Sequence, residues 1–233
     1  MSRPDYLELT YSDQRLPPSD YPTRLTDWLI RNIPLHPGRL LDIGCGRGEY
    51  LKTFAARGFD VIGVDGAASA RRMTEGLPVE VLDIDREPLP FADGSVAYIF
   101  SKSVIEHLQH PNWMLAECAR VLQPGGTAVI MTPSWRHQSR VFFEDYTHVS
   151  PFTVNGLTDA LAVAGFEPVH VRLFWQLPFL WRHSGLHAAV KVISWLPLPY
   201  RPWDPAPWSE RTNKLIRFSK EVMLLGVAQK LRE

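Results

Sequence analysis

The sequence predicts an α/β protein whose parallel β-sheet is covered by helices on both faces. Two observations support this prediction. Short segments rich in Val, Ile and Leu alternate with helical segments between residues 19 and 175, and glycine or proline separates most of them. A glycine-rich loop, GCGRG, directly follows the first apolar segment. Strands and helices that alternate in this way form βαβ units, which build a parallel sheet.

The first part of the chain supplies two helices and two strands. Residues 19–33 are expected to form a helix, because apolar residues recur there at roughly helical spacing and a proline stands near the start. HPG at 36–38 ends this helix, and residues 39–43 are expected to be a short buried strand. After the glycine loop, residues 49–57 form a helix stopped by a glycine, and FDVIGVD at 59–65 forms a β-branched strand that ends in an acid.

The alternation continues through the centre of the chain. A helix is expected over residues 67–74 and a strand over residues 79–85. SVAYIFSKS at 95–103 predicts a fourth strand. Residues 113–122 carry a helical pattern that PGG ends, and TAVIMTP at 127–133 predicts the fifth strand.

The last part of the chain breaks the alternation once. Residues 155–164 predict a helix, and FEPVHVRLFW at 166–175 predicts a sixth strand. Residues 221–230 predict the last strand. The stretch between them, 176–219, is rich in Pro, Trp and Arg and is expected to be an insertion.

The composition predicts a folded cytoplasmic protein. The chain has 233 residues, 45% hydrophobic and 21% charged, and its formal net charge of zero disfavours nucleic acid as a partner. Its two cysteines, Cys45 and Cys118, lie outside any CxxC pattern, which argues against a disulfide framework or a cysteine zinc site. The N-terminal residues lack the apolar core of a signal peptide, and no uncharged apolar run reaches the length of about 18 residues that a membrane span needs.

The glycine loop could bind one of several classes of ligand. Its three glycines stand one residue closer together than the G-x-G-x-x-G of dinucleotide-binding loops, and the Gly-Lys-Ser/Thr of a phosphate-binding P-loop is missing. Asp65 ends the next strand, about 20 residues on, where an acid accepts hydrogen bonds from a ribose. Asp83 and Ile84 end the third strand and offer an acid and an aliphatic side chain to an adenine. The pattern favours an adenosine that carries something other than a recognised phosphate.

These segments resemble the motifs of small, single-domain class I S-adenosylmethionine-dependent methyltransferases. LLDIGCGRGEY resembles the first motif, VIGVDGA the ribose-binding strand end, and VLDIDREPLPFADGSVAYIFSKSVIEHL the adenine segment and fourth strand. HPNWMLAECARVLQPGGTAVIMTP resembles the helix, PGG turn and strand that close the core. The similarity covers residues 39–174 and the last strand. It implies a Rossmann-like three-layer sandwich, with a mostly parallel seven-stranded sheet and an antiparallel last strand, and S-adenosylmethionine as the cofactor.

The resemblance implies roles for the matched residues. The glycine loop would approach the methionine part of the cofactor through its backbone, Asp42 would orient the ammonium through water, and Asp65 would bind the ribose. Ser101, placed just past the fourth strand, would accept from the ammonium through its backbone carbonyl. Each has a plainer alternative: Asp42 could cap the loop, Asp65 could cap the following helix, and Ser101 could be a turn residue. The implied cofactor-binding residues are Asp42, Gly44, Cys45, Gly46, Asp65, Gly66, Asp83, Ile84 and Ser101.

One methyltransferase domain is expected over residues 1–233. Residues 1–36 would form an N-terminal helical cap, in which Tyr11, Tyr21 and Arg24 are candidates to close over the cofactor. Residues 176–219 would form an acceptor-binding lid, and the alternatives are a homodimer contact or a peripheral membrane contact. Aromatic residues for any of these roles are Trp175, Trp181, Trp195, Trp203 and Trp208.

The base for methyl transfer is expected after the fifth strand, in FFEDYTHVSPFT at 142–153. His148 is the predicted general base and Asp145 the acid that orients it. The alternative is that His148 only braces the fold by hydrogen bonds. His107, Tyr146 and Trp175 are predicted to line the acceptor site, with His107 as the second candidate base.

No metal is predicted, because the adjacent acids Glu144 and Asp145 would face opposite ways on a strand. The leading functional hypothesis is O-methylation of a saccharide or glycolipid-type hydroxyl, since the acid–x–T–H–x–x–P–F segment resembles members linked to polysaccharide or lipopolysaccharide modification. One alternative is O-methylation of a small metabolite, such as a quinone precursor or a polyketide phenol. The other is a methyltransferase-fold binding protein without activity.

Overall fold

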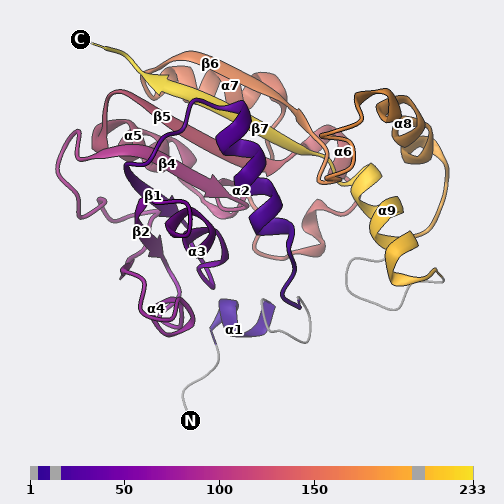
Figure 1. Cartoon of the computed structure of the whole chain (residues 1–233), viewed down its shortest axis with the longest axis horizontal. Coiled ribbons are helices and arrows are strands. Elements are labelled where there is room, and N and C mark those ends of the chain that lie inside the picture. The colour runs from indigo at the N-terminus through magenta and orange to yellow at the C-terminus, as the bar shows by residue number, and fades with distance from the viewer. Residues whose placement is uncertain (1–4, 11–16, 201–207, 233) are drawn as a thin grey trace.

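The computed structural model describes residues 5–10, 17–200 and 208–232. A seven-stranded sheet in the order β3-β2-β1-β4-β5-β7-β6 forms its centre (Figure 1). The first five strands pair in parallel, whereas β7 runs antiparallel to both β5 and β6. The predicted Rossmann-like sheet with an antiparallel last strand is therefore confirmed. The strands are β1 Arg39–Ile43, β2 Asp60–Asp65, β3 Val79–Val81, β4 Val96–Lys102, β5 Leu122–Pro133, β6 Phe166–Phe174 and β7 Met223–Lys230.

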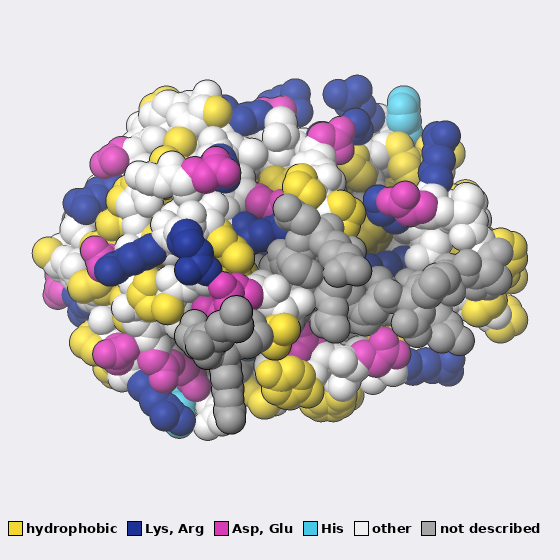
Figure 2. Space-filling model, turned by 90° about the horizontal axis from the view of Figure 1, so that it is seen from below, with side chains coloured by type: hydrophobic (Ala, Val, Ile, Leu, Met, Phe, Trp, Pro, Cys, Tyr) yellow, Lys and Arg dark blue, Asp and Glu magenta, His cyan; other side chains and the backbone are white. Residues whose placement is uncertain are grey.

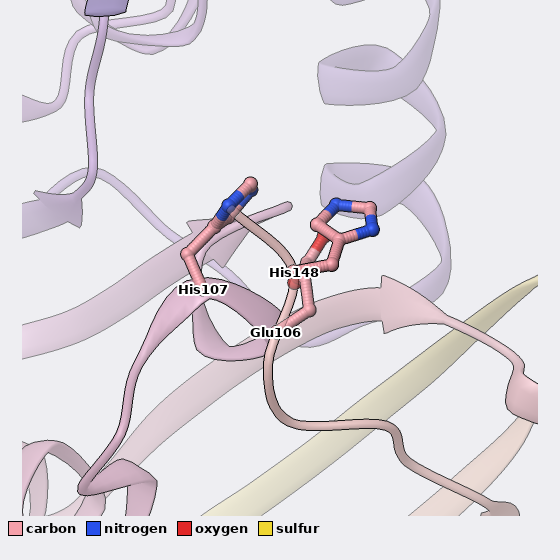
Figure 3. Close-up of side chains that lie close together, drawn as sticks. All are labelled: Glu106, His107 and His148. Atoms are coloured by element: carbon pink, nitrogen blue, oxygen red, sulfur yellow. The ribbon is translucent and has the colours of Figure 1, made fainter. Parts of the chain in front are cut away.

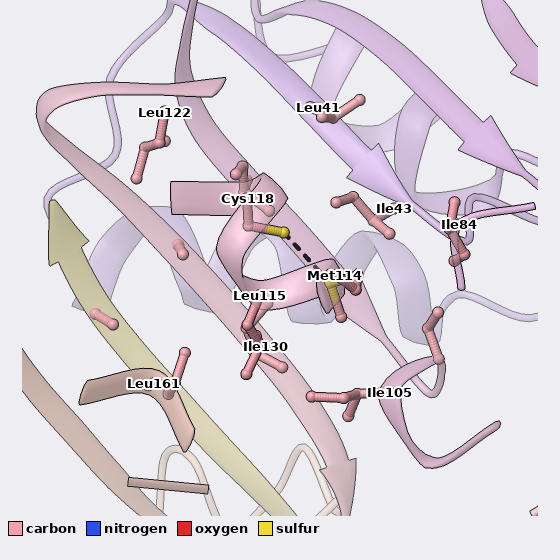
Figure 4. Packing of buried hydrophobic residues seen from close by; sticks show 14 of the residues in the cluster. Leu41, Ile43, Ile84, Ile105, Met114, Leu115, Cys118, Leu122, Ile130 and Leu161 are labelled. Carbon is pink, nitrogen blue, oxygen red and sulfur yellow. Dashed lines mark hydrogen bonds between the residues drawn. The ribbon is translucent and has the colours of Figure 1, made fainter. Parts of the chain in front are cut away.

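Helices cover both faces of this sheet. Leu25 and Leu29 of α2 and Phe54 of α3 are buried in the hydrophobic cluster on one face. On the other face, Met114 and Leu115 of α5 pack in the cluster drawn in Figure 4, to which α7 also contributes. The α-helices are α1 Tyr6–Thr10, α2 Tyr21–Asn32, α3 Glu49–Ala55, α4 Ala70–Met73, α5 Pro111–Val121, α6 Trp135–Gln138, α7 Val154–Val163, α8 His187–Trp195 and α9 Glu210–Lys220. Three short 3₁₀ helices are η1 Ile105–His107, η2 Phe142–Glu144 and η3 Ser184–Leu186.

Several predicted boundaries are wrong, for local reasons. The strand expected over residues 79–85 ends at Val81, because the side chain of Asp83 accepts from the backbone N–H of Asp85 and starts a turn. The helix expected over 67–74 spans only Ala70–Met73. The fifth strand begins at Leu122 rather than residue 127, since Leu122 already pairs with Val96 across an irregular register.

The two helices of the N-terminal segment pack in different parts of the molecule. Helix α2 belongs to the helix layer on the sheet, and Arg24 of this helix forms an exposed ion pair with Asp20. Helix α1 instead lies by the glycine loop, where Leu7 comes within 3.5 Å of the position that a side chain on Gly46 would take. Tyr11 lies outside the described residues.

Residues 176–219 contain α8 and α9 and a small hydrophobic cluster of their own, built on Leu177, Leu180 and Val190. Trp181 anchors this segment to the main domain, with its ring 5.3 Å from that of Phe174. Trp195 is 83% exposed, and Figure 2 shows hydrophobic side chains at the end of the molecule where Figure 1 places α8. Trp203 lies outside the described residues. Among the helices that the structure describes, none combines the length and apolar character of a membrane span.

Candidate active site

The glycine loop is fixed to the end of β2 by its own backbone. The N–H groups of Gly44 and Cys45 both donate to the carbonyl of Val64, at 2.8 and 3.1 Å. The N–H of Gly46 donates to Asp65 Oδ2 at 2.8 Å, and the N–H of Ala67 donates to Asp65 Oδ1 at 2.8 Å. Asp65 therefore ties together the loops that follow β1 and β2 at the carboxyl edge of the sheet.

Close packing explains why two positions here need glycine. A Cβ on Gly44 would lie 2.2 Å from Val104 Cγ2, and the φ of +70° lies in the left-handed region that other residues rarely adopt. A Cβ on Gly63 of β2 would lie 2.6 Å from the sulfur of Cys45. Cys45 itself is buried, which raises the pKa of its thiol, so this cysteine packs against β2 and is not a reactive thiolate.

Two buried polar side chains at this edge lack partners. Asp42 is 2% exposed, and its Oδ2 has no hydrogen bond among the described residues. Burial, followed by the charge of Asp65, raises the pKa of Asp42 well above its usual range. Ser101 is 1% exposed and its Oγ also lacks a partner. Ser101 lies inside β4, opposite Ile43 and Ile130, and not past the strand as the sequence suggested.

The three residues predicted near ribose and adenine differ in exposure. Burial raises the pKa of Asp65, although its hydrogen bonds from the N–H groups of Ala67 and Gly46 oppose this. The side chain of Asp83 is 52% exposed and caps the turn after β3. Ile84 is 8% exposed and packs in the hydrophobic core cluster. The space beside Gly66 is open: the nearest atom to a Cβ added there would be the carbonyl oxygen of Leu82, 3.8 Å away.

A second group of polar residues lies beyond β4 and β5, and its hydrogen bonds fix the orientation of the His107 ring. Tyr6 donates to Asp145 Oδ2 at 2.8 Å, and the Thr147 hydroxyl donates to Asp145 Oδ1 at 2.6 Å. Because the single hydroxyl proton of Thr147 points to Asp145, Thr147 Oγ1 accepts from His107 Nδ1, 2.7 Å away. Burial lowers the pKa of His107 to about 4, and the neighbouring His148 acts in the same direction. His107 is therefore neutral, with its Nε2 left as an acceptor.

His148 is oriented by the backbone. Its Nδ1 lies 2.6 Å from the carbonyl of Phe142, which can only accept, so Nδ1 carries the proton and Nε2 has a free lone pair. The His107 and His148 rings meet edge to face, with centroids 4.7 Å apart. The carboxylate of Asp145 accepts hydrogen bonds from Tyr6 and Thr147, and it orients His107 through Thr147. The prediction that Asp145 orients His148 therefore names the wrong histidine.

Glu106 points between the two histidines, as Figure 3 shows. It is fully buried, its Oε2 accepts from Thr132 of β5 at 2.9 Å, and its Oε1 has no partner among the described residues. Burial raises the pKa of Glu106 to about 7. The backbone carbonyl of Glu106 accepts from the N–H groups of Val149 and Ser150, so η1 and the segment after η2 are joined directly.

The other two residues predicted to line the acceptor site, Tyr146 and Trp175, differ from this group in their exposure and their contacts. Tyr146 is 85% exposed. Trp175 has a buried indole N–H without a partner among the described residues, and its ring meets those of His137 and His187. A cavity of about 200 Å³ lies beyond the end of β5, and its lining includes Ser134, Arg136, His137, Thr153 and Asn155.

Sequence reasoning missed the polar contacts that organise the acceptor side. Lys102 is the clearest case: a lysine at the end of a mostly apolar strand was the available signal. Burial lowers the pKa of Lys102, whereas the charges of Glu106 and Glu49 raise it. Tyr6 gave no signal, because its role depends on a contact with Asp145, 139 positions away. Thr147 was noted only as part of the acid–x–T–H–x–x–P–F segment, without a role of its own.

The chain is similar to known methyltransferases in sequence and in fold. The family described as "Methyltransferase domain" matches residues 18–171. The chain is 38% identical over 137 residues to an uncharacterized 37.1 kDa protein in transposon TN4556 of Streptomyces fradiae, covering 55% of this chain and 39% of that protein. It is 30% identical over 123 residues to a ubiquinone biosynthesis O-methyltransferase of Dechloromonas aromatica, covering 50% of this chain and 53% of that one.

A solved SAM-dependent methyltransferase from Archaeoglobus fulgidus shares the fold, with a TM-score of 0.66 and 23% identity over 97% of this chain and all of that one. The chain spans about half the length, or less, of the first curated relatives that it matches: 39%, 28% and 53%.

The buried carboxyl group of Glu106 predicts a pH-dependent stability. Its folded pKa of about 7 exceeds the ordinary value near 4.5, so its protonated form favours the folded state. That contribution is complete below about pH 4.5 and is lost as the pH rises to about 7. Relative to Glu106→Gln, which cannot ionise, the wild type should lose about 3 kcal/mol of unfolding free energy across this interval.

Urea unfolding of both proteins between about pH 5 and pH 8 measures this difference. Glu167→Gln, at an exposed position of β6, is the matched control and should follow the wild type. Parallel stability curves for wild type and Glu106→Gln would show that Glu106 is not a buried acid with a raised pKa.

Proposed function

The chain belongs to the methyltransferase-domain family, and we propose that it transfers a methyl group from S-adenosylmethionine to a hydroxyl of an organic acceptor. One observation carries the proposal. The carboxyl edge of the sheet holds, near the glycine loop, a buried Asp42 carboxyl group whose Oδ2 has no partner among the described residues. Beyond β4 and β5 it holds a histidine whose Nε2 is available as an acceptor. The first is suited to a cationic amino-acid ligand and the second to a hydroxyl that must lose its proton.

The described residues fit the cofactor. Asp42 Oδ2 and Ser101 Oγ are buried polar atoms that an ammonium and its ordered water would satisfy. Each Asp65 oxygen accepts one backbone N–H and keeps a lone pair that can accept a ribose hydroxyl. Gly66, Asp83 and Ile84 follow in the loops where the adenosine would lie. When bound, S-adenosylmethionine supplies a methyl group on a sulfonium, which needs no further activation.

His148 is the proposed base. The carbonyl of Phe142 holds its Nδ1 proton, so Nε2 can accept a proton from an acceptor hydroxyl. His107 is held neutral by burial, and its Nε2 can accept from a second hydroxyl of the acceptor. In this arrangement Asp145 and Thr147 position His107 and have no direct part in proton transfer.

A saccharide or glycolipid-type acceptor is the proposed substrate class. The cavity beyond β5 is lined by both polar and apolar side chains, and the ring of Trp175 lies against His137, a mixture that suits a sugar with its hydroxyls and apolar ring faces. A phenolic acceptor is the second candidate, because relatives at about 30% identity carry the name ubiquinone biosynthesis O-methyltransferase. The segment 176–219 is proposed as the part that selects between them.

Calorimetric titration with S-adenosylmethionine tests the cofactor site. The wild type should bind, and Asp65→Ala should bind at least about tenfold more weakly, because it loses the ribose acceptor and the tie to Gly46. Asp60→Ala, at the exposed opposite end of the same strand, is the matched control and should bind like the wild type. No heat with the wild type, or equal binding by Asp65→Ala, would contradict the assignment.

An acceptor screen tests the reaction. Glycans and phenols are offered separately, and S-adenosylhomocysteine is measured. Release with glycans supports the saccharide class, release with phenols supports the second candidate, and no release above background with either contradicts transferase activity. With the active acceptor, His148→Ala should lower kcat about 100-fold at unchanged cofactor binding, as expected for loss of a general base. His170→Ala, exposed on β6, is the control. Full turnover by His148→Ala would show that His148 is not required.

A further inference from the structure

We propose that Glu106, His107 and His148 form a binding site for one divalent transition-metal ion, such as Zn²⁺ or Mn²⁺. Each residue offers one ligand atom, and these atoms all lie within 4.8 Å of one another. Figure 3 shows the three side chains converging from η1 and from the segment after η2. Two imidazoles and one carboxylate are a donor set that binds such ions and leaves positions open on one side.

Each of the three side chains has a possible ligand atom for which the described residues supply no hydrogen bond. Glu106 is fully buried, its Oε2 is occupied by Thr132, and its Oε1 has no partner among the described residues. A buried carboxylate oxygen without a partner is costly, and a cation would satisfy it. Both histidines are held at Nδ1, which leaves Nε2 of each ring as the coordinating atom.

The outer contacts are also those of metal-binding histidines. Such residues usually donate their second ring N–H to a carboxylate, a carbonyl or another fixed acceptor, which sets the tautomer and the ring orientation. His148 donates to the Phe142 carbonyl, and His107 donates to Thr147, which is itself fixed by Asp145. The two rings are thus oriented by independent acceptors before any ion binds.

The spacing requires a closure of about 1 Å. An ion about 2.1 Å from each of its tetrahedral ligands holds any two of them about 3.4 Å apart, compared with the 4.8 Å limit found here. The backbone carbonyl of Glu106 accepts from Val149 N and Ser150 N at 2.9 and 3.0 Å, so the two segments that carry the ligands are already joined. Side-chain rotations that bring the ligand atoms up to about 1.4 Å closer complete the site.

A bound ion would position the methyl acceptor. This consequence rests on the proposed function. An acceptor oxygen could occupy an open coordination position and be held at the end of β4 and β5. With the ion bound, His148 Nε2 would be a ligand, so the base role proposed for His148 applies to the metal-free protein. The expectation of no metal rested on the lack of a convergent pair of acids, whereas this cluster combines one acid with two histidines.

Metal binding is measured on the full chain without cofactor or acceptor. The protein is stripped with a chelator and titrated by calorimetry with Zn²⁺, Mn²⁺ and Mg²⁺ in separate runs. We expect about one Zn²⁺ or Mn²⁺ per chain and much weaker binding of Mg²⁺, which prefers oxygen ligands. No binding of Zn²⁺ or Mn²⁺ by the wild type overturns the proposal, and so does Mg²⁺ binding as tight as theirs.

Variants then locate the ion. Glu106→Gln and His148→Ala should each weaken binding at least about tenfold, whereas His170→Ala, exposed on β6, should match the wild type. Unchanged affinity in both cluster variants overturns the assignment, and His107→Ala replaces either variant that fails to fold. S-adenosylmethionine titrations on the same samples separate the two proposals: intact cofactor binding without metal binding contradicts only this one.

Discussion

The organisation of the carboxyl edge depends on the way Asp65 and Val64 hold the glycine loop. The Val64 carbonyl and the Asp65 carboxylate together accept the N–H groups of three consecutive loop residues, Gly44, Cys45 and Gly46. The loop can lie this close only because Gly44 and Gly63 carry no side chain against Val104 and Cys45. Its backbone is therefore set before any ligand arrives, and nearby Asp42 is buried with an oxygen that has no partner among the residues described. Preformed geometry of this kind reduces the ordering cost of binding.

The acceptor side is built on the same edge by different means. The start of α1 contacts both sides: Asp5, directly before the helix, accepts from the backbone N–H and hydroxyl of Ser69 beside β2, while Tyr6, its first residue, donates to Asp145 beyond β5. Movement of α1 would affect the glycine loop through Leu7 and the orientation of His107 through Asp145 and Thr147. Cofactor and acceptor groups are thus connected through one short helix, which offers a physical route by which one side can sense the other.

Much of the fold could be predicted from the sequence, because buried parallel strands are apolar throughout and glycine or proline separates them from helices. Boundaries were wrong where a side chain competed with the backbone pattern, as Asp83 does after β3. The glycine loop and the strand-end position of Asp65 were also predictable, since both are local in sequence. The acceptor side was not, because side-chain direction there is set by contacts between distant segments. Thr132 fixes Glu106 across 26 positions, and Thr147 redirects Asp145 from His148 to His107.

The central claim is that one edge of the sheet holds the cofactor over β1 and β2 and presents its reactive end to the cluster of Glu106, His107 and His148. A crystal structure of the chain with S-adenosylhomocysteine tests this most directly. We expect the ribose hydroxyls within hydrogen-bonding distance of Asp65, about 2.7–3.2 Å, the ammonium on the Asp42 side, and the sulfur facing the cluster. A ligand bound elsewhere, or one whose sulfur faces away from the histidines, would contradict the account.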